Sequence, residues 1–213
     1  MTIRHHISDE LLMAYTASTL PEAFSLVIAT HLSMCDECRA RSMTFDALGG
    51  AVIENDAVDM SDGSLAACLA RIEAMPQLAP KTPVRSDVPQ PLADYVGGGL
   101  ASVKWRPLGL GARQAILRTS DKSGASVRLL YIPGGSAMPD HGHNGLELTL
   151  VLQGAFRDDE DRFGAGDVEI ADASVQHTPV AEAGQVCICL AATQGPLKFQ
   201  GLMPRLAQPF FRI

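Results

Sequence analysis

The chain has 213 residues, of which 46% are hydrophobic and 19% charged, and this composition excludes a wholly disordered protein. The formal net charge of −7 argues against direct nucleic-acid binding, and without a signal peptide or a run of about 18 apolar residues we expect a cytoplasmic protein with no membrane contact. Five cysteines, an odd number that includes one C-x2-C pair, indicate metal or redox chemistry rather than a disulfide scaffold.

The first part of the chain predicts four helices, at residues 9–15, 21–32, 36–50 and 61–75. Ser8 suits the N-cap of the first helix, and acids follow it in the first turn. The third helix is expected to stop at Gly49–Gly50. The fourth carries apolar residues at helical spacing, and Cys68 among them is expected in the core.

A proline-rich segment with five prolines between residues 76 and 91 predicts an extended linker, placed at 86–94. Residues 1–85 hold 6 Lys+Arg against 11 Asp+Glu, whereas residues 86–213 hold 11 against 13. After the linker, short β-type runs separated by Gly and Pro predict a sandwich or small barrel. These runs cover residues 126–132, 146–152, 167–170, 186–192 and 197–203. We therefore expect an α+β protein of two domains, at 1–85 and 95–213.

The first cluster of ligand-type residues is His31, Cys35 and Cys38, spaced H-x3-C-x2-C, which puts them on one side of a helix or helix junction. Structural zinc takes four ligands and favours thiolate and imidazole, so the spacing predicts a zinc site. The fourth ligand must come from elsewhere, and His5 and His6 are both candidates. Two alternatives are buried thiols without a metal and a redox pair, although a thioredoxin-like βαβ pattern is missing around it.

The second cluster is His141, His143, Glu147 and His177. The H-x-H spacing puts two imidazoles on one face of a strand, and Glu147 and His177 can converge from neighbouring strands. Three nitrogens and one carboxylate suit Zn, Fe, Mn or Ni. The alternative is a β domain that binds no metal.

The second cluster resembles the first cupin motif, G-x5-H-x-H-x3-E-x6-G, which is matched without a gap by Gly135, His141, His143, Glu147 and Gly154. The second cupin motif is partial. Gly164 stands where proline is usual, the closing His177 is present, and the usual downstream asparagine is absent. The resemblance implies a cupin β-barrel of the jelly-roll type.

The first cluster resembles the zinc-binding anti-sigma domain. A helical zinc domain followed by a cupin domain is the arrangement of the ChrR-type zinc anti-sigma factors of the bacterial singlet-oxygen response, and the resemblance runs from the opening MTIRHH through ELTLVLQGAFRD to the closing RLAQPFFRI. It implies one zinc ion in each domain. The implied ligands in the helical bundle are His6, His31, Cys35 and Cys38. In the cupin site they are His141, His143, Glu147 and His177.

The partner that this resemblance implies is an extracytoplasmic-function sigma factor, bound as a 1:1 heterodimer by the helical domain and so kept from core RNA polymerase. The cupin domain is implied in its release when singlet oxygen or organic hydroperoxide appears. Such a protein regulates transcription and is not an enzyme. The acidity of the helical part suits a partner whose surfaces normally face DNA and polymerase.

Two other functional classes remain open at this point. Many cupins are dioxygenases or isomerases with this ligand set, so a cupin metalloenzyme is the alternative, although it leaves the helical cluster unexplained. A redox or metal sensor with a different protein partner is the third.

Cys187 and Cys189 share one face of a strand and are interpreted as buried apolar residues or as oxidisable thiols near the metal. The acidic run Asp158–Asp161 is expected to cap a solvated hairpin.

Overall fold

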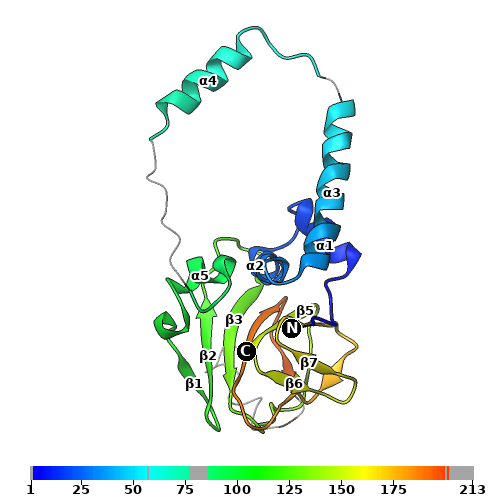
Figure 1. The fold of residues 1–213 in the computed structure, drawn as a ribbon, viewed down its shortest axis with the longest axis vertical. Coiled ribbons are helices and arrows are strands. Elements are labelled where there is room, and N and C mark those ends of the chain that lie inside the picture. The colour runs from blue at the N-terminus through cyan, green and yellow to red at the C-terminus, as the bar shows by residue number, and fades with distance from the viewer. Residues whose placement is uncertain (1, 57, 77–85, 200, 202–213) are drawn as a thin grey trace.

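The computed structural model describes residues 2–56, 58–76, 86–199 and 201. Figure 1 shows helices above a β-sandwich, with one helix far from the rest. The helices are α1 (Asp9–Thr16), α2 (Glu22–Leu32), α3 (Asp36–Asn55), α4 (Ser64–Ala74), α5 (Gln90–Val96) and the short 3-10 helix η1 (Leu100–Ser102). In the described part of the chain, every helix is too short or too polar to cross a membrane.

The strands of the described residues form three antiparallel sheets. They are β1 (Arg106–Gly109), β2 (Ala112–Leu117), β3 (Ser126–Ile132), β4 (His141–Gly142), β5 (Glu147–Gln153), β6 (Ala155–Arg157), β7 (Arg162–Gly164), β8 (Val168–Ala171), β9 (Gln176–His177), β10 (Val180–Ala181), β11 (Cys187–Thr193) and β12 (Lys198–Phe199). One sheet has the order β1-β2-β3-β11-β5-β8, and the smaller ones have the orders β10-β6-β7 and β12-β4-β9.

The jelly-roll barrel that the family resemblance implies is wrong in its detail, because the sheets do not close; the β domain is a cupin-like sandwich of separate sheets, the other form that the short strands predicted. The strands of the smaller sheets are only two or three residues long. Such short strands do not extend the hydrogen-bond ladder around both edges of the large sheet, as closure would require. The predicted run at 197–203 corresponds to β12, and its residues 200, 202 and 203 lie outside the described residues.

Helix α2 joins the helical part to the sandwich. It contacts β11, β5 and β3 of the large sheet, and it lies across one end of that sheet in Figure 1. Phe24, Val27 and Ile28 of α2 belong to the same buried cluster as Leu148 and Leu190 of the sheet. One continuous hydrophobic core therefore spans α2 and the large sheet.

The far half of α3 and all of α4 leave this core. The predicted stop at Gly49–Gly50 is wrong, because α3 continues to Asn55. A glycine inside a helix costs only about 1 kcal/mol relative to alanine, so two of them weaken the helix without ending it. Helix α4 has no buried residue, and Cys68 on it is exposed rather than in a core. The four predicted helices are present, but among the described residues α4 does not pack with the other three into one bundle.

The segment predicted as a linker is partly helical. Helix α5 begins at Gln90 within it and packs on α2, with Leu92 fully buried. The hydroxyl of Tyr95 donates to Glu22 Oε1 at 2.7 Å, which ties α5 to the first turn of α2. Residues 77–85, and the closing RLAQPFFRI on which part of the family resemblance rests, lie outside the described residues.

Candidate functional site

The helical cluster lies where α2 ends and α3 begins. His31 is in the last turn of α2, and its carbonyl accepts hydrogen bonds from the backbone N–H groups of Met34 and Cys35. Cys35 caps α3, because its Sγ accepts from the backbone N–H of Cys38 at 3.4 Å. This tight junction directs the three predicted ligand side chains to one point.

The structure brings a fourth ligand-type residue to this point. One ligand-type atom from each of four residues lies within 4.8 Å of the others: His6, His31, Cys35 and Cys38. His6 Nδ1 is 3.3 Å from Cys35 Sγ and 3.5 Å from Cys38 Sγ. His5, the other candidate, instead places its Nε2 3.0 Å from Asp161 Oδ2. Of the two histidines left open by the spacing, His6 is the one that joins the cluster.

The electrostatics of this cluster suit a metal with nitrogen and sulfur ligands. His31 Nδ1 donates to the Gly166 carbonyl at 2.9 Å, and its buried Nε2 has no hydrogen-bond partner among the described residues. Burial lowers the pKa of His31 to about 4, so the ring is neutral at pH 7 with a lone pair on Nε2. Burial also raises the pKa of the Cys38 thiol to about 11, so a bound metal would displace its proton. Two thiolates and two imidazoles fit tetrahedral zinc.

The cupin cluster is assembled from three short elements. His141 on β4 pairs directly with His177 on β9, His143 follows β4, and Glu147 begins β5. The ring centroids of the three histidines are 4.7 to 5.2 Å apart. Their ligand-type atoms lie within 4.8 Å of one another, and Glu147 Oε2 is 3.1 Å from His143 Nδ1. The structure therefore brings all four predicted residues together.

Two nitrogens of this cluster, His143 Nε2 and His177 Nε2, are buried without a hydrogen-bond partner in the described structure, and His143 Nδ1 and Glu147 Oε2 have only each other, at 3.1 Å. Other atoms of the same residues are satisfied. His141 Nδ1 donates to the Pro139 carbonyl at 2.8 Å, and Glu147 Oε1 accepts from Thr149 Oγ1 at 3.0 Å. Buried polar atoms without partners are rare, and this converging group fits the ligand set of a metal ion.

The pKa shifts of His141 and Glu147 agree with that fit. Burial lowers the pKa of His141, which favours the neutral imidazole that a metal needs. Burial alone would raise the pKa of Glu147, but its hydrogen bond with His143 and the nearby imidazoles hold it below the usual value. The cluster thus offers a carboxylate beside imidazole nitrogens.

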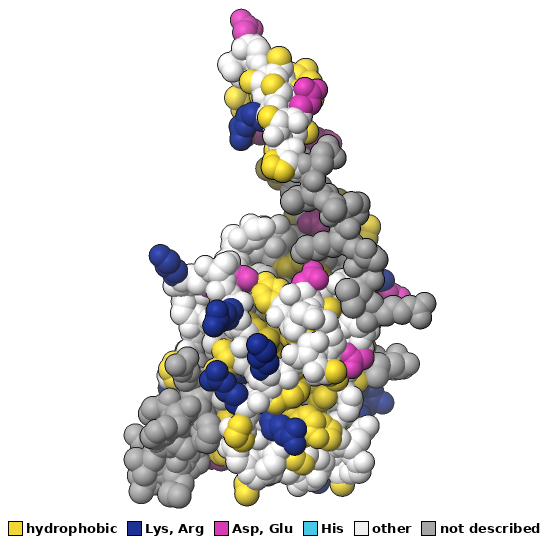
Figure 2. All heavy atoms as spheres, turned by 90° about the vertical axis from the view of Figure 1, so that its left-hand side faces the viewer, with side chains coloured by type: hydrophobic (Ala, Val, Ile, Leu, Met, Phe, Trp, Pro, Cys, Tyr) yellow, Lys and Arg dark blue, Asp and Glu magenta, His cyan; other side chains and the backbone are white. Residues whose placement is uncertain are grey.

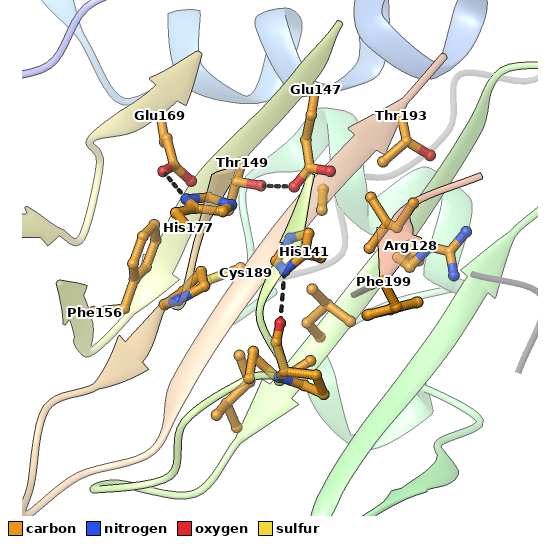
Figure 3. A pocket seen from close by; sticks show the side chains of 17 residues that line it. Arg128, His141, Glu147, Thr149, Phe156, Glu169, His177, Cys189, Thr193 and Phe199 are labelled. Atoms are coloured by element: carbon orange, nitrogen blue, oxygen red, sulfur yellow. Dashed lines mark hydrogen bonds and ion pairs between the residues drawn. The ribbon is translucent and has the colours of Figure 1, made fainter. Parts of the chain in front are cut away.

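A small cavity of about 70 Å³ lies against these residues (Figure 3). Much of its lining is apolar, including Leu130, Ile132, Phe156 and Phe199. Arg128 also lines it, but the guanidinium donates to Gln114 Oε1 at 3.1 Å and to Ser126 Oγ at 2.9 Å. The site can hold a metal ion and leaves room for a small molecule beside it.

Two acids at this site were not predicted from the sequence. Asp158, placed in a solvated hairpin by the sequence, has its Oδ2 3.2 Å from His177 Nδ1. Glu169 on β8 has its Oε1 2.9 Å from the same nitrogen. In the sequence Glu169 is marked only as an acid between Val168 and Ile170 in a predicted strand. The alternation of side chains along a strand would have placed it on the solvent face.

Cys187 and Cys189 lie inside the sandwich. Both belong to its smaller buried cluster, with their Sγ atoms 3.5 Å apart. The hydrogen bond with Cys187 and burial raise the pKa of the Cys189 thiol, which keeps it protonated and weakly reactive. The structure favours the interpretation as buried apolar residues.

Comparisons with known proteins show similarity over the whole chain. The family model of the ChrR cupin-like domain matches residues 97–197. A protein of Cereibacter sphaeroides named anti-sigma-E factor ChrR is 62% identical over 215 residues, and the match covers 100% of both chains. A crystal structure of Rhodobacter sphaeroides SigE in complex with the anti-sigma ChrR contains a chain that is 63% identical, with a TM-score of 0.79 over 90% of this chain and 99% of that one.

Proposed function

This chain belongs to the ChrR family of anti-sigma factors, and from that premise we propose that it binds one extracytoplasmic-function sigma factor in a 1:1 complex and keeps it from core RNA polymerase. The full-length relationship also decides between the classes left open by the sequence: the chain is a regulatory protein rather than a cupin metalloenzyme. Because sigma factors act on the polymerase, the proposed site of action is the cytoplasm.

The observation that carries this proposal is the apolar surface of α3 and α4. On α4, Leu65, Leu69 and Ile72 follow one another at helical spacing and are 70%, 50% and 58% exposed. Val52 and Ile53 near the end of α3 are exposed as well. Figure 2 shows hydrophobic side chains over the surface of α4, at the top of that view. An amphipathic helix that packs on nothing in the described part of its own chain is suited to a groove on a partner.

The acidity of residues 1–85 also supports a sigma factor as the partner. Residues 1–85 hold 11 Asp+Glu against 6 Lys+Arg. A sigma factor must contact DNA and polymerase, so basic surface is expected on it, and opposite charge would speed and orient the encounter.

The test is the affinity of the full chain for the sigma factor. Replacing Leu65 and Leu69 together by Asp should weaken binding about 30-fold or more, because the few hot-spot residues at the centre of an interface cost about 2 kcal/mol or more when they are lost. Leu110→Asp is the matched control, since Leu110 is 93% exposed at the β1–β2 turn of the sandwich. Equal affinities for the double variant and the control would contradict the assignment of α4 to the interface.

We further propose that each cluster holds one zinc ion. In the helical site the S2N2 donor set supports a structural role, in which zinc binding contributes folding free energy. In the cupin site the buried Nε2 atoms of His143 and His177, which have no partner among the described residues, support a bound metal. The proposed role of the cupin site is to permit release of the sigma factor when singlet oxygen or organic hydroperoxide is present.

A further inference from the structure

A buried pair of carboxyl groups stands behind His177. Asp158 follows β6 and Glu169 is on β8, and their side chains are only 4% and 8% exposed. Each lies within hydrogen-bond distance of the same ring nitrogen, His177 Nδ1, at 3.2 and 2.9 Å. Figure 3 shows Glu169 next to His177, with Glu147 and His141 on the other side of that ring. Burying two acids is costly, so their partners must compensate for the lost hydration.

The contacts of His177 divide the ring into two sides. Carboxylates are acceptors only, so Nδ1 carries the proton that they bind. The other nitrogen, Nε2, is buried and has no hydrogen-bond partner in the described residues. The ring centroids of His141 and His143 are 4.7 and 5.2 Å away. In the neutral ring that a metal needs, the tautomer that satisfies the acids therefore leaves the Nε2 lone pair for the cluster.

Both acids are themselves fixed in place. Asp158 Oδ1 accepts from the backbone N–H groups of Glu160 and Asp161, at 3.0 and 2.9 Å, which leaves Oδ2 for the histidine. Glu169 is opposite Thr149 in the β5–β8 ladder. A ring held by two anchored acceptors has little freedom to rotate, and rotation would carry Nε2 out of the cluster.

We propose that Glu169 and Asp158 are positioning residues that hold the His177 ring so that its Nε2 faces the metal of the proposed cupin site. The inference rests on the proposed metal content. A carboxylate behind a ligating histidine fixes its orientation and makes it a stronger ligand, and loss of such a partner typically lowers metal affinity about 10- to 100-fold.

The experiment measures zinc affinity of the cupin site in the full chain by competition with a chelator. Glu169→Gln combined with Asp158→Asn keeps both shapes and removes both charges, so affinity should fall about 10- to 100-fold while the helical site keeps its zinc. Asp159→Asn, an exposed acid in the same loop, is the control and should leave the affinity unchanged. Unchanged affinity in the double variant would overturn the inference.

A second measurement does not depend on any variant folding. Nitrogen-15 NMR of the zinc-loaded wild-type chain should show His177 with its proton on Nδ1. A proton on Nε2 instead would overturn the proposed orientation. A third zinc ion that disappears in the double variant would also overturn it, since the acids would then be ligands. A wild-type chain that binds only one zinc would count against the proposed metal content rather than against the positioning role.

Discussion

Cys38 is fully buried at the centre of the helical cluster, so its thiolate is a direct test of the metal there. We expect Cys38→Ala to reduce zinc from two ions per chain to one, as read by plasma mass spectrometry. Zinc binding in small structural sites is linked to folding by about 10 kcal/mol or more in peptide models, so α1 and the start of α3 should also lose protection from hydrogen exchange.

Cys68→Ala is the matched control for this change. Cys68 is an exposed thiol on α4, so its loss should alter neither the zinc content nor the exchange of α1. Two zinc ions per chain in Cys38→Ala would contradict a structural metal at this cluster.

At the residue scale, the sequence spacing predicted the candidate metal ligands but not the acids that contact one of them, His177. H-x3-C-x2-C and H-x-H-x3-E are local patterns, and the structure brings their members together with His6 and His177. Glu169 and Asp158 lie eight and nineteen residues before His177 and meet it only through the pairing of β5 with β8 and the loop after β6. No local sequence pattern predicts these contacts, because they depend on how distant strands pair.

The turn between β7 and β8 connects the two clusters. Gly166 in this turn accepts from His31 Nδ1, and Asp167 Oδ1 accepts from the backbone N–H groups of Arg4 and His5, at 2.6 and 3.0 Å. Two residues further on, Glu169 contacts His177. The N-terminal segment that carries His6 is therefore held against the strand that supports the cupin site.

We expect Asp167→Ala to weaken zinc binding at the helical cluster although Asp167 is not a ligand. Without this carboxylate the backbone N–H groups of Arg4 and His5 lose two hydrogen bonds, and His6 next to them loses its fixed position. A loss of about tenfold in zinc affinity is typical of such supporting groups. The measurement is chelator competition in a His141→Ala background, where only the helical site retains zinc.

Asp159→Ala provides the control for that measurement, since this acid is exposed on the loop that precedes β7. Equal zinc affinities for the Asp167 and Asp159 variants would show that the turn does not support the helical cluster.

The bounds of α2, which the core covers, were predicted more closely than the end of α3, which lies outside the core. Helix α2 has a broad apolar face that the sheet covers, so its bounds agree with the predicted 21–32 within a residue. The end of α3 lies outside the core, where Gly49 and Gly50 have no atom within 4 Å of an added Cβ. With no packing to end the helix, the weak local preference of glycine did not decide its length.

On the scale of the whole molecule, the helical part and the sandwich share one core through α2. We expect a fragment of residues 1–85 to bind and inhibit the sigma factor, because α1–α4 and the helical cluster all lie within it. We also expect α2 to be less protected from hydrogen exchange there than in the full chain. Each large apolar side chain that loses cover costs about 1.5–3 kcal/mol, and Phe24, Val27 and Ile28 all lose it.

Full protection of α2 in the fragment would contradict the stabilising role of the sandwich. A stable fragment that leaves the sigma factor active would contradict the assignment of partner binding to the helices.

The most direct test of the anti-sigma role is transcription reconstituted from core RNA polymerase and the extracytoplasmic-function sigma factor of the same cell. One equivalent of the full chain should abolish transcripts from a promoter of that sigma factor and leave those of the housekeeping sigma factor unchanged, while the Leu65→Asp, Leu69→Asp variant should inhibit far less. Undiminished transcripts in the presence of excess, zinc-loaded chain would contradict the proposal that this protein is an inhibitor of the sigma factor.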